Sequence, residues 1–170
     1  MLQLGLGRQL LDVRADPAAT RGAASLGLVY EGLGDEPVLA DALSDGTLGF
    51  LAIIGMVELI RTRPSNARPM LLALDEPDLH LHPRAQRYLT SFLESASNDV
   101  QILIATQSDV VLDALSEPAA SVVLCELEQD RLATVLKRPD PEALAAWIDD
   151  YAGYGSLRRA GLEQLVTSAD

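Results

Sequence analysis

Two short runs of apolar residues without polar alternation stand out along the chain, at 70–74 and 100–105. Runs of this length are typical of strands that are buried on both faces of a sheet. A longer apolar stretch at 47–60 predicts a helix, and a helical pattern at 83–97 separates the two strands. Because a helix connects them, we expect the two strands to pair in parallel.

The rest of the pattern predicts hairpins and short helices around this centre. Hairpin strands are expected at 26–31 with 37–40, and at 121–126 with 131–137, the second pair turning at Gln129-Asp130. Further helices are expected at 3–13, 109–115, 139–151 and 156–167. Alternating strands and helices of this kind predict an α/β fold.

The first buried strand leads directly into Asp75, Glu76 and Pro77. It therefore places two carboxylates at the carboxyl edge of a sheet, where open α/β folds bind their ligands. Buried unpaired acids are costly, so both need a cation, a water network or a strong donor. A nucleotide-hydrolysing site has this requirement, with one acid for Mg²⁺ and a neighbour for the attacking water. The alternative is a strand that ends in a solvated acidic turn.

Polar groups precede the 47–60 helix and follow the second strand. Ser44 or Asp45 is a natural N-cap, and Gly46 allows another group to approach the backbone closely. The amino end of a helix attracts anions. Thr106 and Gln107 follow the second strand and would lie beside the two acids if the strands are neighbours. An ordinary capped helix and an ordinary loop are the alternatives.

Composition narrows the class of protein. The 170 residues are expected to form a single domain, and 48% are hydrophobic while only 4% are aromatic, which suits a globular α/β core. No apolar stretch is long enough for a bilayer span, and the start shows no secretory signal, so we expect a cytoplasmic protein without membrane contact. A net charge of −12 argues against a large nucleic-acid footprint, although a weak or partner-assisted contact stays open.

Isolated candidate residues favour ordinary roles. Cys125 lies in an apolar run and is expected to be a reduced, buried thiol. Trp147 lies on an apolar helix face and is expected to pack in the core. His80 and His82 lack a third metal ligand nearby, so packing or exposure is a better interpretation than a metal site.

Taken together, these segments resemble the C-terminal part of an ABC-type P-loop ATPase domain, in the AAA-family branch of OLD-, RecF- and SMC-like proteins. The resemblance begins at about residue 25 and continues to the C-terminus. The matching motifs are the signature (43–47), the Walker B strand (70–76), the D-loop (77–83) and the switch segment (105–108). The resemblance implies a three-layer P-loop NTPase-like domain, with a mainly parallel sheet and flanking helices.

The resemblance also implies roles for individual residues. Asp75 would hold Mg²⁺, Glu76 would be the general base for water, and Gln107 would occupy the switch position. Asp78 would lie in the segment that communicates across a dimer.

The signature segment has its own implied role. Ser44, Gly46 and the backbone near Thr47 would contact the γ-phosphate of an ATP molecule that is bound mainly by a second subunit.

Two departures from the family pattern matter. The switch residue of the family is usually histidine, whereas Gln107 can donate a hydrogen bond but cannot titrate near neutral pH. These 170 residues also contain no Gly-x-x-x-x-Gly-Lys-Ser/Thr loop, and their only lysine is Lys137. Because that loop grips the nucleotide, we expect the isolated chain to bind ATP and Mg²⁺ weakly or not at all and to be inactive.

Two functions from different classes remain. The chain is either half of an ABC-type ATPase, active when another segment or chain supplies the P-loop, or a degenerate module that binds and regulates a partner ATPase. The retained acids Asp75 and Glu76 favour the first function, while Gln107 and the missing loop favour the second. Either function predicts self-association or a P-loop-containing partner, because an incomplete parallel sheet exposes an edge and apolar surface. The biological process stays open.

Overall fold

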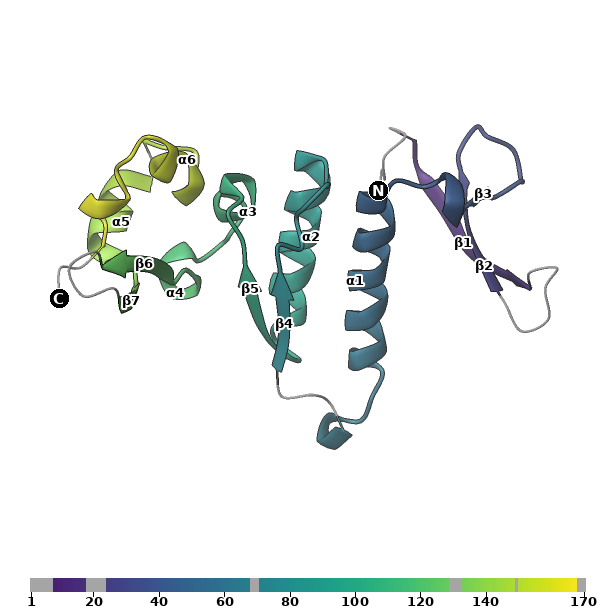
Figure 1. The fold of residues 1–170 in the computed structure, drawn as a ribbon, viewed down its shortest axis with the longest axis horizontal. Coiled ribbons are helices and arrows are strands. Elements are labelled where there is room, and N and C mark those ends of the chain that lie inside the picture. The colour runs from purple at the N-terminus through teal and green to yellow at the C-terminus, as the bar shows by residue number, and fades with distance from the viewer. Residues whose placement is uncertain (1–7, 18–23, 68–70, 129–132, 149, 168–170) are drawn as a thin grey trace.

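The structure, a computed structural model, describes residues 8–17, 24–67, 71–128, 133–148 and 150–167. Three groups of elements follow one another along the longest axis of the molecule (Figure 1). An antiparallel sheet stands at one end, helices around a parallel strand pair form the middle, and a hairpin with short helices forms the other end. The predicted α/β class is confirmed.

The N-terminal sheet contains β1 (Leu10–Pro17), β2 (Ala24–Tyr30) and β3 (Val38–Leu39), followed by the 3₁₀ turn η1 (Ala40–Ala42). All neighbours pair antiparallel, so the hairpin expected at 26–31 and 37–40 is confirmed. The helix expected at 3–13 is wrong for the part that the structure describes, because β1 begins at Leu10 and pairs with β2 along its length. Non-local pairing outweighs local helical preference here.

The middle group contains α1 (Asp45–Arg61), η2 (Ser65–Ala67), β4 (Leu71–Asp75), α2 (Pro83–Ala96), β5 (Gln101–Ala105) and α3 (Asp109–Asp113). The two strands pair in parallel, as predicted, and their register places Asp75 opposite Ala105. The last residue of each strand therefore lies at the same edge. The segments that follow β4 and β5 therefore both begin at this edge of the strand pair.

One face of the β4–β5 pair packs against α1 and α2. Leu72 is buried there, and Leu74, Ile102 and Ile104 are partly buried against the same core as Phe50 and Leu93. The opposite face is open, since Leu71 is 49% and Leu103 59% exposed. The expectation of burial on both faces is therefore wrong for this chain alone, because within the described residues only one side of the pair is covered.

The C-terminal group contains α4 (Pro118–Ser121), β6 (Leu124–Glu128), β7 (Ala133–Lys137), α5 (Pro141–Ile148), α6 (Tyr154–Arg159) and η3 (Glu163–Leu165). The strands β6 and β7 form the expected antiparallel hairpin, whose turn at 129–130 lies outside the described residues. A second core gathers Val122, Leu144, Tyr154, Leu157 and Val166.

The helix expected at 156–167 ends early, at Arg159. Gly161 adopts a φ of +74°, and its N–H donates to the carbonyl of Arg158 at 2.8 Å. A left-handed glycine of this kind stops an α-helix, so the chain continues as the separate turn η3.

Two side chains are more exposed than expected. Cys125 is an exposed thiol, not a buried one. Its partner in the hairpin register is Leu136, which is 62% exposed on the same face. Trp147 is 37% exposed, so it does not pack in the core as expected. Among the described residues, no helix is long and apolar enough to cross a membrane.

Candidate functional site

The chain turns sharply directly after β4. Asp75 is exposed at the end of the strand, and Glu76 adopts a φ of +43°. The Glu76 N–H donates to the Ala105 carbonyl at 2.8 Å, which extends the pairing of the strands by one residue. A left-handed residue other than glycine costs about 1–3 kcal/mol and persists only where its surroundings impose it. The contact with β5 therefore holds the Glu76 side chain in a defined place beyond the sheet edge.

The residue after Thr106 reaches back to this acid. The Nε2 atom of Gln107 donates to Oε1 of Glu76 at 3.2 Å, and both residues are accessible to solvent. The structure thus brings together the two residues for which the family resemblance implies catalytic roles. A carboxylate that can accept a proton and an amide that can donate to an oxygen face the same opening.

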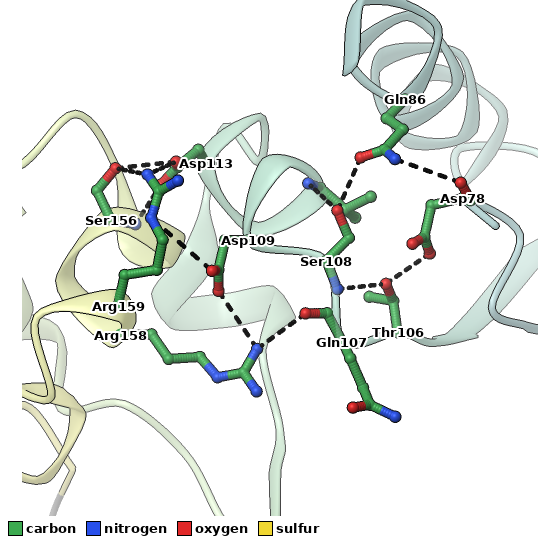
Figure 2. Close-up of polar contacts among 11 residues, drawn as sticks. Asp78, Gln86, Thr106, Gln107, Ser108, Asp109, Asp113, Ser156, Arg158 and Arg159 are labelled. Carbon is green, nitrogen blue, oxygen red and sulfur yellow. Dashed lines mark hydrogen bonds and ion pairs between the residues drawn. The ribbon is translucent and has the colours of Figure 1, made fainter. Parts of the chain in front are cut away.

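A network of hydrogen bonds joins the segment after β4 to the segment after β5 and to α2 (Figure 2). Thr106 Oγ1 donates to Asp78 Oδ1 at 2.6 Å and accepts the N–H of Ser108 at 3.0 Å. Ser108 Oγ donates to Gln86 Oε1 at 2.8 Å, while Gln86 Nε2 donates to the backbone carbonyls of Asp78 (3.3 Å) and Leu81 (3.1 Å). The D-loop, the switch segment and α2 are therefore fixed to one another.

The amino end of α1 lies against the same D-loop. Ser44 Oγ accepts the N–H of Thr47 at 3.2 Å and lies 2.9 Å from Thr47 Oγ1, so the predicted N-cap is confirmed. A Cβ added to Gly46 would meet the carbonyl oxygen of His80 at 2.3 Å. The close approach expected at this glycine is therefore made by the backbone of the D-loop, and His80 itself adopts a φ of +62°.

The two histidines of the D-loop, His80 and His82, are on the surface of the molecule. His82 Nδ1 accepts the N–H of Arg84 at 3.2 Å and caps α2, and both His80 and His82 are exposed. Among the residues that the structure describes, no group of three or more His, Cys, Asp or Glu side chains could hold a metal ion. The exposed carboxylate of Asp75 nevertheless suits Mg²⁺, which proteins often bind through one or two carboxylates together with substrate phosphates and water.

Sequence reasoning missed Gln86 and Arg158. Arg158 Nη1 donates to the backbone carbonyl of Gln107 at 3.2 Å and lies 3.4 Å from Asp109 Oδ1. No local sequence pattern predicts the contacts of Gln86 or those of Arg158. Gln86 is one polar residue among several on α2, and Arg158 lies 51 positions from Gln107.

Comparisons with known proteins identify the family of the chain. Residues 8–113, more than half of the chain, match the family described as "AAA domain, putative AbiEii toxin, Type IV TA system". The retron Vc95 probable ATPase of Vibrio cholerae serotype O1 biovar El Tor is 28% identical over 87 residues, which cover 48% of this chain and 17% of that relative.

A solved structure has the same fold. It is described as "Structural biochemistry of ATP-driven dimerization and DNA stimulated activation of SMC ATPases" and matches with a TM-score of 0.60, at 13% identity, over 81% of this chain and 79% of that chain. The chain therefore belongs to the family described as "AAA domain, putative AbiEii toxin, Type IV TA system", and it carries part of a P-loop ATPase-family domain.

Proposed function

We propose that this chain supplies the hydrolytic part of an ABC-type ATP-hydrolysing site, and that hydrolysis requires a P-loop from another segment or chain. The observation that carries the proposal is the contact between Gln107 and Glu76 at 3.2 Å, at the edge where two parallel strands end. Membership in an ATPase family supports it. The four motifs belong to a single domain that spans residues 1–170.

In the assembled site, Asp75 would hold Mg²⁺, which would offset charge on the phosphates, and Glu76 accepts a proton from the attacking water. Gln107 donates a hydrogen bond to that water or to a phosphate oxygen. Because glutamine cannot take up the proton, it acts by positioning alone. Asp78 lies in the segment that communicates with a facing subunit.

The amino end of α1 serves a nucleotide that is held mainly by a second subunit. Ser44 is exposed there, while Gly46 and Thr47 are buried beneath it. The backbone N–H groups of this helix end favour a phosphate oxygen.

The open face of the β4–β5 pair supports the need for a partner. Leu71 and Leu103 are large apolar side chains with about half of their surface in water. We expect a second copy or a P-loop-bearing partner in the same cytoplasmic compartment. Light scattering of the isolated chain at high concentration tests self-association, and a purely monomeric species would contradict a second copy as the partner.

Mg·ATP hydrolysis tests the proposed reaction. We expect no phosphate release from the chain alone, and turnover when it is assembled with a P-loop-bearing polypeptide. Glu76→Gln should abolish that turnover while assembly persists. Glu142→Gln, at an exposed position in α5, is the matched control and should keep it. Unchanged turnover in Glu76→Gln would remove Glu76 as the base.

A regulatory module is the second candidate, favoured by Gln107 and by the absence of a Walker A loop in these residues. This function predicts a complex in which the partner's own hydrolysis changes. In that complex, Glu76→Gln and the unaltered chain behave alike.

A further inference from the structure

The short helix α6 is closely fitted to α3, near the switch segment. A Cβ added to Gly155 would meet the backbone oxygen of Asp109 at 2.0 Å, and one added to Gly153 would meet Oδ1 of Asp113 at 2.7 Å. Only glycine allows these approaches. The backbone of α6 therefore rests directly on α3, which begins immediately after the switch segment.

Polar contacts secure this docking (Figure 2). The carboxylate of Asp113, whose side chain is 7% exposed, accepts the N–H of Ser156 at 2.7 Å and its hydroxyl at 2.9 Å. Arg159 Nη2 lies 3.4 Å from Asp113 Oδ2 and donates to Ser156 Oγ at 2.8 Å. These contacts fix α6 without involving the switch segment.

Arg158 shares Asp109 with Arg159, whose Nε lies 3.8 Å from Asp109 Oδ2, but Arg158 also contacts the switch segment. Its Nη1 atom reaches the backbone carbonyl of Gln107 at 3.2 Å and the carboxylate of Asp109 at 3.4 Å. The side chain of Gln107 extends from the same residue toward Glu76. The guanidinium thus holds the backbone of the residue whose amide faces the proposed base. Asp109 keeps the cation in place, and charge-assisted hydrogen bonds are stronger than neutral ones.

We propose that Arg158 is a positioning residue, which sets the place of the Gln107 amide beside Glu76 by holding the Gln107 carbonyl. Its catalytic meaning rests on the proposed function, but the positioning itself does not. Through Arg158, the C-terminal segment, which lies beyond the family match at 8–113, controls the geometry of the site.

Nuclear magnetic resonance of the complete chain tests the positioning without any partner. In Arg158→Ala, the side-chain amide resonances of Gln107 should move toward those of a solvent-exposed glutamine. Exchange of the Ser108 N–H, which is bonded to Thr106, should accelerate roughly ten-fold. Arg158→Lys, which retains a donor, should restore most of both signals.

Arg159→Ala is the matched control. It removes the same charge from the neighbouring position and weakens the contacts with Asp113 and the longer ion pair with Asp109 (3.8 Å), but it has no bond to Gln107. The Gln107 and Ser108 signals should therefore stay unchanged in Arg159→Ala. The Ser156 N–H should stay protected in Arg158→Ala, because Asp113 still accepts it. If Arg158→Ala lowers stability severely, Arg158→Met is used in its place, because methionine keeps the aliphatic stem.

Two results would overturn the proposal. In the first, the Gln107 and Ser108 signals do not change in Arg158→Ala. In the second, they change equally in Arg159→Ala, which would mean that docking alone matters.

Steady-state kinetics of the assembled ATPase provide a separate test. Arg158→Ala should lower kcat about ten-fold with an unchanged KM for ATP, and Arg158→Lys should recover it. An inactive wild-type assembly would reject the proposed function, while the resonances would still decide the role of Arg158.

Discussion

Two regions of the molecule differ in how well their polar side chains are hydrogen-bonded. One is the switch segment after β5, and the other is the C-terminal core. In the switch segment, Thr106 and Ser108 hydroxyls both have partners, at 2.6 Å and 2.8 Å. In the C-terminal core, the hydroxyl of Tyr154 and Oε2 of Glu163 are buried without a hydrogen-bond partner in the described part of the chain. A polar group therefore stabilises the first region and costs free energy in the second.

This difference supports the proposal that the ends of β4 and β5 are organised for chemistry. A fully bonded network holds side chains in one geometry before any ligand arrives, which catalysis by positioning requires. The C-terminal core keeps a phenol where phenylalanine would fit, and burial, followed by the nearby Glu163 carboxylate, raises the pKa of Tyr154. Four changes sharpen or break the contrast, beginning with the largest expected effect.

Glu76→Gln should lower the turnover of the assembled ATPase by about 10²–10⁴-fold, because a general base typically contributes that much. Assembly and thermal stability should hardly change, since Glu76 is partly exposed and glutamine keeps its shape. Phosphate release and Tm are the measurements. A variant that loses stability together with activity would show that Glu76 is a structural residue.

Gly46→Ala should destabilise the chain by about 1–3 kcal/mol, because the new Cβ would lie 2.3 Å from the His80 carbonyl oxygen. Gly49→Ala is its control three residues further along α1, where nothing lies within 4 Å. That change should stabilise the helix by about 0.5–1 kcal/mol. Urea unfolding measures both. Equal effects of the two changes would refute the close contact between α1 and the D-loop.

Thr106→Val should cost about 1–2 kcal/mol, because it removes the donor to Asp78 and the acceptor for the Ser108 N–H while keeping the side-chain volume. Urea unfolding gives the free energy, and exchange of the Ser108 N–H reports the local loss. No change in either quantity would contradict the picture of a bonded network.

Tyr154→Phe should be neutral or stabilising by up to about 1 kcal/mol, since it deletes a buried hydroxyl without a hydrogen-bond partner in the described residues. The pH dependence follows from the raised pKa. Above the ordinary value of 10.0, the unfolded chain loses the phenolic proton while the folded chain retains it, so stability falls as pH rises.

The variant should reduce this alkaline decline without abolishing it, because burial also raises the pKa of Tyr30. Unfolding free energies at about pH 8 to 11, a range that spans the ordinary pKa of 10.0, provide the comparison. A clear loss of stability at pH 8 would reveal a partner for the hydroxyl.

The sequence predicted the centre of the fold because its signals are local and agree with each other. A helix between two apolar runs specifies a parallel pair, and the parallel pair places Gln107 beside Glu76. Ser44 is a cap by its residue type, and the structure confirms it. Expectations of this kind depend on neighbours in sequence or on one pairing rule.

Other features depend on packing, which no local pattern encodes. The apolar run of β4 could not reveal that one of its faces is open in this chain, nor could the run around Cys125 reveal that the thiol points outward from the hairpin. β1 becomes a strand through its pairing with β2. The contact of Arg158 with Gln107 joins residues 51 positions apart.

The most direct test of the central claim is a calorimetric titration of Mg·ATP into the chain alone and into the chain assembled with a P-loop-bearing polypeptide. The account predicts weak or undetectable binding to the chain alone, and tight binding, sensitive to substitutions at Asp75, in the assembly. Nanomolar to low-micromolar binding by the isolated chain would contradict the claim that these residues form only part of the site.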